Sequence, residues 1–394
     1  MNVTFITHSN KFYGANRSLF NLIEGLQTYD VNLQVIAPYI FSPDANSMSN
    51  HLKEIGVPVY NIPLSWWVSP STNGHFLKKR RDAFYHLLSN FRHLPKLIKV
   101  VRAWQTDIIY TNSSVLPMGA WASYFTGLPH VWHLRELNDL HYEAYFDWGK
   151  WIMLTLISQA AVNIYISETV QSYYQRSGRA KQYVIYNGVA SIGQFDSLRQ
   201  QALHTLADKK VYTFAIIGVI HPSKGQEEAI RAMALLVRRY PNTRLLIVGA
   251  GDTDFLKGLI SELSLDEKVE LWGHIDEPYK AFFAADAILM CSRHEAMGRV
   301  TVEAMAASRP VIGYADGGTV ELIEDGKNGL LYRGGPEELA HKMCYLVGNS
   351  EKGRQMGAYG WTLAREKYSI ERYAEEVYEV LSSLMSPPVS RTNY

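Results

Sequence analysis

The sequence contains little cysteine and no excess of charge of either sign. Its two cysteines among 394 residues, Cys291 and Cys344, lack the spacing of a metal site and lie in apolar surroundings. This pattern predicts buried thiols in a reducing compartment and disfavours a fold held by disulfides. The 39 basic and 38 acidic side chains nearly cancel, leaving a net charge of +1. Overall charge therefore gives no attraction to nucleic acid.

Long apolar runs and an export signal are also missing. The most apolar window, residues 151–166, is interrupted by Gln159 and Asn163. It is shorter than the roughly 20 apolar residues that span a bilayer. The N-terminus begins with the strand-like stretch VTFIT and lacks the order of basic, apolar and small residues of an export signal. These absences predict a cytoplasmic protein without a transmembrane helix.

The chain does contain two successive runs of alternating strand and helix patterns. Expected strands cover residues 3–7, 33–37, 57–62, 106–112, 129–134, 161–166 and 184–186 in the first run, and 211–218, 245–248, 287–290 and 311–314 in the second. Such alternation predicts an α/β fold of two doubly wound, Rossmann-like domains that face a cleft. We expect residues 1–189 to form the first domain, 190–210 a connector and 211–368 the second. Two helical segments should follow Leu331, and we expect disorder after Ser386.

The richest stretch for chemistry runs from Ser292 to Thr319. It reads as a strand end, a polar loop, a helix ended by Pro310 and a second strand. Glu295 falls in the loop and Glu303 in the helix, eight positions later. On one continuous helix these carboxylates would lie roughly 12 Å apart along the axis, so we expect them to bind different parts of one long ligand.

A sugar nucleotide fits this arrangement. Gly298 opens the helix, so backbone N–H groups there can bind a diphosphate, and one turn later Glu303 can accept both hydroxyls of a ribose. After the second strand, the glycines of Asp316-Gly317-Gly318-Thr319 let backbone amides approach phosphate oxygens. The donor-binding candidates here are Gly298, Arg299, Val300, Thr301, Glu303, Gly317, Gly318 and Thr319.

These residues carry a family resemblance. Glu295 and Glu303 form E-x7-E, and EAMAASRPVI and GGTVELIEDGKNGLL follow. The whole stretch resembles the signature of glycosyltransferase family 4, whose members have the GT-B fold. The resemblance covers nearly the full chain and implies that residues 1–189 bind the acceptor and 211–368 the nucleotide sugar. It also implies that a final helix, residues 369–386, crosses back to the first domain.

The resemblance assigns expected roles to further residues. Glu303 would bind the donor ribose and Glu295 would lie beside the donor sugar. His133, in the segment HLRE, matches a histidine that hydrogen-bonds the sugar, although a lone histidine at a strand end is more often structural. Gly14 matches a glycine loop that faces the diphosphate, with one glycine where two are usual; the alternative is a tight turn that contacts nothing. We therefore expect His133, Lys224 and Glu295 to be catalytic.

One position departs from the family pattern. That pattern has an arginine directly after the glycine of the strand 211–218 and a lysine five residues later. Lys224 matches the lysine and would neutralise the leaving diphosphate, unless it is a surface lysine before a helix. Val219 stands at the arginine position. Arg293 and Arg299 are both candidates to replace the missing cation.

Residues 66–102 are rich in basic and aromatic side chains, and Asp82 is the only acid between His75 and Thr106. This composition favours docking on an anionic membrane surface, at roughly 1 kcal/mol per basic residue. A solvated face or an anionic acceptor site is the alternative.

Two other ligand patterns are incomplete. Gly249-Ala250-Gly251 follows a strand, but Asp254 stands where the third glycine of a dinucleotide fingerprint would be. Asp252-Thr253-Asp254 resembles a metal-binding D-x-D, yet such short acidic loops usually cap the next helix. We expect neither a cofactor nor a metal.

The resemblance implies a retaining, metal-independent glycosyltransferase. Its expected donor is a nucleoside diphosphate sugar, with UDP as the expected carrier, and its expected acceptor a hydroxyl of a glycan or lipid-linked molecule in surface polysaccharide or glycoconjugate assembly. The alternatives are a sugar-nucleotide isomerase of the same fold and a non-catalytic subunit that binds the donor.

Overall fold

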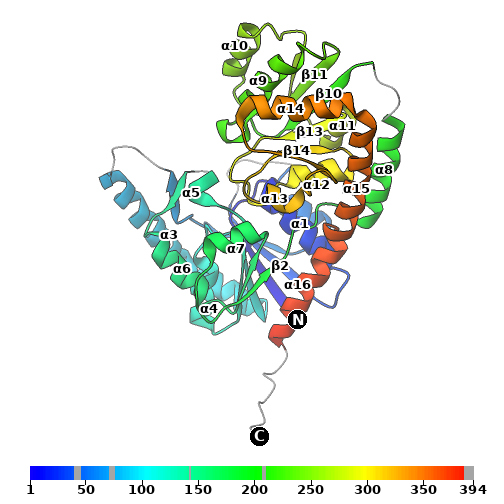
Figure 1. Cartoon of the computed structure of the whole chain (residues 1–394). Helices are drawn as coiled ribbons and strands as arrows, with labels where there is room; N and C mark the ends of the chain where they lie inside the picture. Colours follow the sequence, from blue (N-terminus) through cyan, green and yellow to red (C-terminus); the bar gives the residue numbers. More distant parts are fainter. Residues whose placement is uncertain (40–45, 71–75, 142, 206–209, 386–394) are drawn as a thin grey trace. The chain divides into compact units, whose positions relative to one another are not determined.

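The computed structural model describes residues 1–39, 46–70, 76–141, 143–205 and 210–385 (Figure 1). The chain forms two compact units. The N-terminal unit comprises Met1–Gly188 and the segment from Ile370 onward, and the C-terminal unit comprises Val189–Ser369. The predicted disorder after Ser386 lies outside the described residues.

The sheet of the N-terminal unit is parallel throughout, in the order β3-β2-β1-β5-β6-β8-β9. Its central strands are buried on both faces, which explains their near-continuous apolar sequences. The order reverses between β1 and β5, and open α/β sheets bind ligands beyond the carboxyl ends of strands at such a reversal. The strands are β1 (Asn2–Thr7), β2 (Asn32–Ala37), β3 (Val59–Asn61), β5 (Ile108–Asn112), β6 (His130–Leu134), β8 (Val162–Tyr165) and β9 (Lys181–Val184).

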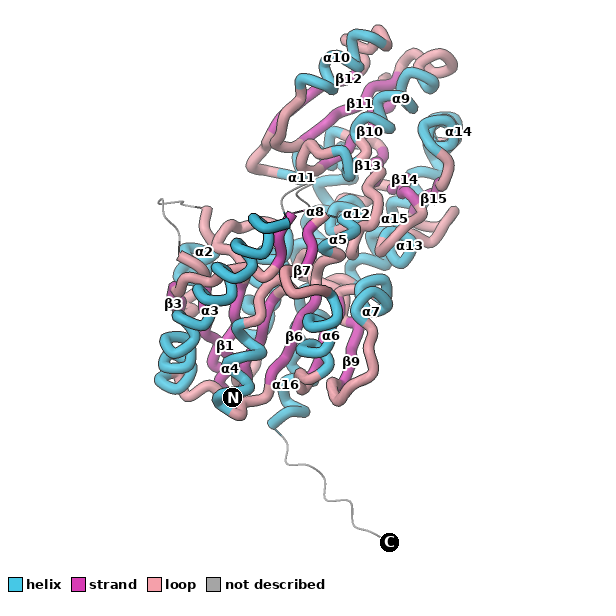
Figure 2. The backbone as a smooth tube through the Cα atoms, turned by 90° about the vertical axis from the view of Figure 1, so that its left-hand side faces the viewer, coloured by secondary structure: helices cyan, strands magenta, loops and turns pink. Residues whose placement is uncertain are grey.

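Helices cover this sheet, and three of them, α3, α4 and α6, lie over the face turned to the viewer in Figure 2. The last described helix, α16, packs on α1, where a Cβ added to Gly25 would meet the Cβ of Ala374 at 2.7 Å. The helix predicted to return to the first domain therefore belongs to the N-terminal unit. The helices are α1 (Gly14–Leu26), α2 (Met48–Glu54), α3 (Phe76–Ala103), α4 (Met118–Thr126), α5 (Asn138–His141), α6 (Lys150–Ser158), α7 (Glu168–Tyr174) and α16 (Ile370–Met385).

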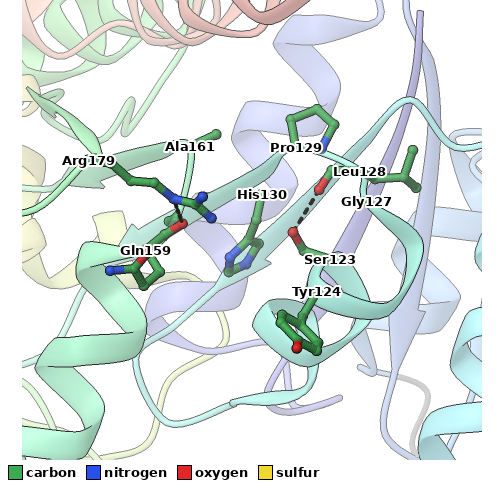
Figure 3. Close-up of a pocket in the computed structure, with 10 residues that line it drawn as sticks. Ser123, Tyr124, Gly127, Leu128, Pro129, His130, Gln159, Ala161 and Arg179 are labelled. Carbon is green, nitrogen blue, oxygen red and sulfur yellow. Dashed lines mark hydrogen bonds between the residues drawn. The ribbon is translucent and has the colours of Figure 1, made fainter.

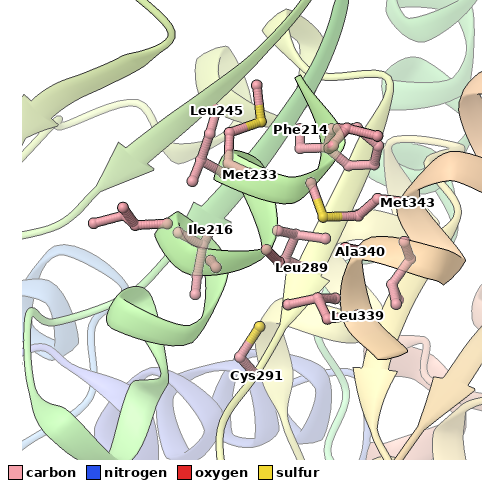
Figure 4. Close-up of a cluster of buried hydrophobic side chains, with 14 of the residues drawn as sticks. Phe214, Ile216, Met233, Leu245, Leu289, Cys291, Leu339, Ala340 and Met343 are labelled. Carbon is pink, nitrogen blue, oxygen red and sulfur yellow. The ribbon is translucent and has the colours of Figure 1, made fainter. Parts of the chain in front are cut away.

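The C-terminal unit has a second parallel sheet, in the order β12-β11-β10-β13-β14-β15, which reverses between β10 and β13. Leu245, Leu289 and Met343 belong to its buried apolar core, which Figure 4 shows around the strands. The strands are β10 (Tyr212–Ile217), β11 (Thr243–Val248), β12 (Val269–Gly273), β13 (Ala287–Met290), β14 (Val311–Tyr314) and β15 (Gly329–Tyr332).

The helices of the C-terminal unit pack against this sheet and against one another. The segment expected as a connector contains α8, which packs within this unit on α11, α12 and α15. The helices are α8 (Ile192–Thr205), the one-turn η1 (Pro222–Lys224), α9 (Gln226–Leu236), α10 (Asp254–Glu262), α11 (Pro278–Ala284), α12 (Arg299–Ala306), α13 (Thr319–Leu322), α14 (Gly335–Gly348) and α15 (Ser350–Lys367).

Several local predictions need correction. Between Leu331 and the last described residue, Met385, there are three helices rather than two, because the helix is interrupted between α14 and α15 at Asn349, without a proline to signal it. The edge strand β9 begins before the predicted residues 184–186, since polar residues of a half-exposed strand hide its pattern. Cys291 is a buried thiol as predicted, but Cys344 is only partly buried. Among the described residues, no helix combines the length and apolarity needed to cross a bilayer.

Candidate active site

The predicted residues of the C-terminal unit meet where its sheet order reverses. The loop after β10 carries Lys224, and the loop after β13 carries Glu295. Lys224 Nζ lies 2.9 Å from Glu295 Oε2, and the two side chains are 24% and 17% exposed. His221 caps the one-turn helix η1 that ends in Lys224, accepting a hydrogen bond from the Ser223 backbone N–H. The structure thus brings together a cation and a carboxylate that are far apart in the sequence.

The glycines after β14 hold the Glu295 loop. Gly318 N donates to Glu295 O at 2.7 Å. A Cβ on Gly317 would lie 2.5 Å from Glu295 O, and one on Gly318 would lie 2.6 Å from Ala296 O. The close approach of the neighbouring loop therefore requires glycine at both positions. This packing gives a reason for both glycines that the sequence did not reveal, and their predicted phosphate contact stays a prediction.

The helix α12 begins beside this loop. Its N-cap, Gly298, has a φ of 90°, a left-handed conformation that favours glycine. The buried hydroxyl Oγ1 of Thr301 has no hydrogen-bond partner among the described residues, and neither has that of Thr319. Val300, in the first turn, is partly buried. The start of α12 therefore carries unused hydrogen-bonding capacity close to Glu295.

Glu303 lies one turn deeper in α12, with its side chain 9% exposed. Its Oε1 accepts a hydrogen bond from Arg299 Nη2 at 3.3 Å. Because Arg299 is the first residue of the helix, the Glu303 carboxylate points toward the N-terminus of α12. The predicted contact of Glu303 with a donor ribose stays a prediction.

The histidine predicted in the N-terminal unit is fully buried at the carboxyl end of β6. His133 Nδ1 lies 2.5 Å from Tyr110 Oη and 3.1 Å from Arg135 Nη2. Since a guanidinium only donates, Nδ1 accepts and the ring proton is on Nε2. Burial and then the Arg135 charge hold the pKa of His133 well below its usual value, so the ring is neutral. Nε2 has no partner among the described residues, which leaves an N–H donor for a ligand.

Neighbours of His133 form a polar network that sequence reasoning missed. Arg135 donates to Asn112, Asn187 and Tyr373. Glu136 Oε2 accepts from the N–H and the hydroxyl of Ser114, while Oε1 is buried without a partner among the described residues. The sequence could indicate only that Arg135 and Glu136 follow a predicted strand end, where functional residues often lie. It could not indicate their partners.

Gly14 is the first residue of α1 rather than part of a longer loop, and its φ of 40° favours glycine. A Cβ there would have no neighbour within 4 Å among the described residues. The position thus has a conformational reason to be glycine and open space beside it. Gly14 lies after β1 and His133 at the end of β6, so both lie at the carboxyl edge of the same sheet.

A pocket of 480 Å³ lies elsewhere in the N-terminal unit (Figure 3). It lies near the amino ends of β6 and β8 and contains none of the predicted residues, whereas ligands of such sheets bind at the carboxyl ends. Its His130 bonds Thr111, and burial lowers the histidine pKa to about 3. Its lining residues are Ser123, Tyr124, Gly127, Leu128, Pro129, His130, Gln159, Ala160, Ala161 and Arg179.

The acidic loop considered as a metal site has a local function. Asp252 Oδ1 accepts from the Asp254 N–H at 2.9 Å, and Asp254 pairs with Lys257 at the start of α10. Among the described residues no three His, Cys, Asp or Glu side chains gather as metal ligands.

Comparisons with known proteins agree with this geometry. The description "Glycosyltransferase Family 4" matches residues 12–191, and "Glycosyl transferases group 1" matches residues 200–362. An uncharacterized glycosyltransferase of Methanocaldococcus jannaschii is 30% identical over 370 residues, covering 84% of this chain and 86% of that protein. The alpha-monoglucosyldiacylglycerol synthase of Acholeplasma laidlawii is 24% identical over 389 residues, covering 93% and 91%.

A solved structure shares the whole architecture. HepE of Anabaena, crystallised with UDP and glucose, is 26% identical with a TM-score of 0.75, and the match covers 97% of this chain and 100% of HepE. The sheet orders, the Lys224–Glu295 pair and these relatives lead to one conclusion: the chain belongs to glycosyltransferase family 4 and has the GT-B fold of two Rossmann-like domains.

Proposed function

We propose that this glycosyltransferase transfers a sugar from a UDP-linked donor to a hydroxyl of a glycan or lipid-linked acceptor, with retention of the anomeric configuration and without a metal. The observation that carries the proposal is the Lys224–Glu295 pair, 2.9 Å long, at the sheet reversal beside the start of α12. A cation next to a helix N-terminus suits a diphosphate, and a carboxylate next to it suits sugar hydroxyls.

The donor would lie along these residues. Lys224, Gly298 and the first N–H groups of α12 would bind the diphosphate. Glu303 would accept the ribose hydroxyls, and Glu295 would orient the transferred sugar. HepE, crystallised with UDP-glucose at 25% identity, supports a UDP-linked donor. Gly14 would contribute a backbone contact.

In the retaining reaction, the bond between the anomeric carbon and the diphosphate oxygen breaks as the acceptor oxygen attacks from the same face. The acceptor proton passes to the leaving phosphate oxygen, so no protein base is required. His133 suits this scheme, because its Nδ1 is occupied and its neutral Nε2–H donates rather than accepts. Lys224 stabilises the charge that develops on the diphosphate.

The acceptor proposal draws on a relative and on a surface. The relative is the alpha-monoglucosyldiacylglycerol synthase, whose product is a glycolipid. The surface is on α3, where Phe84, Tyr85, Leu88 and Phe91 are 48% to 71% exposed. Arg92, Lys96 and Lys99 are exposed and continue this face at helical spacing. An apolar stripe followed by basic side chains fits an anionic leaflet, so we place the enzyme peripherally on the cytoplasmic face of a membrane in surface polysaccharide or glycoconjugate assembly.

Vesicle flotation tests the surface. The protein is expected to float with vesicles containing phosphatidylglycerol and not with phosphatidylcholine alone. Reversing Arg92, Lys96 and Lys99 to glutamate should lower binding at least 100-fold, at about 1 kcal/mol for each lost positive charge. A matched variant reverses three exposed basic residues elsewhere, Lys53, Lys210 and Lys352. Equal binding to both vesicle types, or equal loss in both variants, would remove the membrane from the proposal.

Turnover tests the reaction. With UDP-glucose and a diacylglycerol or glycan acceptor, we expect UDP release that depends on the acceptor, and a product whose anomeric proton coupling in NMR matches that of the donor. Conversion of the sugar nucleotide without an acceptor would instead identify an isomerase. A thermal shift with sugar nucleotides but no turnover with any acceptor would identify a non-catalytic subunit. A β-linked product would contradict retention.

A further inference from the structure

The proposed donor site lacks the arginine that the family pattern places directly after the strand 211–218. The residue in that position is Val219, which is 60% exposed. Its side chain is uncharged and cannot neutralise a diphosphate. A nucleoside diphosphate carries at least two negative charges, and Lys224 balances one of them. A second positive charge near the start of α12 would strengthen binding.

Arg293 is committed elsewhere. Its Nη2 lies 3.1 Å from Glu228 Oε2, and its guanidinium lies 4.0 Å from the ring centroid of Tyr314. Burial alone would lower the pKa of Arg293, but Glu228 and Tyr314 outweigh it and raise the pKa. The other carboxylate oxygen of Glu228 is buried without a partner among the described residues, so moving Arg293 away would leave a poorly compensated charge. Arg293 therefore anchors the loop after β13 to α9.

Arg299 has a different environment. It follows Gly298 directly, so its side chain leaves the helix in the first turn, at the positive end of the helix dipole. Its contact with Glu303, at 3.3 Å, is longer than the 2.7–2.9 Å typical of charge-assisted hydrogen bonds. The two side chains are only 15% and 9% exposed, so the ion pair is shielded from water. The Thr301 hydroxyl, which has no hydrogen-bond partner in the described part of the chain, lies in the same turn.

We propose that Arg299 is the second diphosphate-binding cation and that donor binding exchanges its partner. In the structure the guanidinium neutralises Glu303. The ribose hydroxyls then donate to Glu303, and Arg299 turns to the diphosphate. Lys224 and Glu295 form an equivalent pair, 2.9 Å apart. On donor binding, the Glu295 carboxylate would bind the sugar and the Lys224 ammonium would bind the diphosphate. This inference rests on the proposed function, because it assumes that the ligand contains both a pentose and a diphosphate.

The exchange predicts a loss specific to phosphate. Binding of uridine, UMP and UDP is measured by calorimetry for the wild type and for Arg299→Ala. The substitution should weaken UDP about 10- to 100-fold, the effect of one lost charge-assisted hydrogen bond or two, and change uridine little. Adding Val219→Arg to Arg299→Ala should restore most of the UDP affinity, because it returns a cation to the family position. UDP-glucose turnover should follow the same order.

A matched control is Arg231→Ala, which removes another arginine paired with a glutamate one helical turn away, on the exposed side of α9. It should leave UDP binding unchanged. If Arg299→Ala fails to fold in a thermal melt, Arg299→Gln replaces it, since the amide still donates to Glu303 without a charge, and the same UDP loss is expected.

The outcomes separate two failures. A wild type that binds no UDP would end the proposed UDP-linked function itself. A wild type that binds UDP, combined with equal losses of uridine and UDP in the Arg299 variant, would overturn the inference about Arg299 alone. Absence of any recovery with Val219→Arg would likewise overturn it.

Discussion

Glu295→Ala is expected to lower kcat about 100-fold while donor affinity falls much less. Glu295 holds Lys224 through the 2.9 Å ion pair and, in the proposed reaction, orients the transferred sugar. A small misplacement of reacting groups costs about that factor in rate. Glu303→Ala should show the opposite balance, with UDP-glucose affinity reduced about 10- to 100-fold through lost bonds to the ribose.

Steady-state kinetics with varied UDP-glucose, together with direct binding of UDP, separate these effects. Glu262→Ala is a suitable control, because this exposed glutamate ends α10 away from the sheet reversal. If the two variants changed kcat and donor affinity in the same proportion, the separate roles of the two carboxylates would be wrong.

Gly317→Ala is expected to abolish most donor binding without any change to a charged residue. The new Cβ would lie 2.5 Å from Glu295 O, and the φ of 55° is left-handed. Left-handed strain and overpacking together cost roughly 2–5 kcal/mol. The loop that carries Glu295 must then move or the C-terminal unit must lose stability. Thermal unfolding and UDP calorimetry on the same samples measure the two effects.

Gly258→Ala provides the comparison. Gly258 lies inside α10 with no heavy atom within 4 Å of an added Cβ among the described residues. Alanine there should stabilise the protein by up to about 1 kcal/mol and leave UDP binding unchanged. Normal UDP affinity in the Gly317→Ala variant would show that the loop does not depend on this glycine.

Two strands of the C-terminal unit could be predicted from the sequence to the residue, whereas β10 and β11 differ from the predicted bounds by one or two residues at an end. β13 (Ala287–Met290) and β14 (Val311–Tyr314) have the predicted bounds, because strands buried on both faces read as unbroken apolar runs. The start of α12 was placed within one residue for a similar local reason, since Gly298 ends the loop and Pro310 follows the helix. The family signature added the joint position of Lys224 and Glu295.

Contacts between distant segments could not be predicted. The two-stranded ribbon of β4 (Val68–Pro70) and β7 (Ala144–Phe146) has only three residues in each strand, too few to show an alternating pattern. The packing of Gly317 and Gly318 on the Glu295 loop depends on two separate loops meeting. The partners of Arg135 come from residues as far along the chain as Tyr373, so local spacing could not reveal them.

The position of α16 has a consequence for biosynthesis. The core of the N-terminal unit includes Tyr373, Ala374, Val377 and Leu381, packed with apolar residues of α1 and the sheet. A ribosome must therefore translate residues 189–369 before this core can close. During synthesis the apolar face of α1 stays without its partner until α16 has been made, whereas the C-terminal unit is contiguous in the chain.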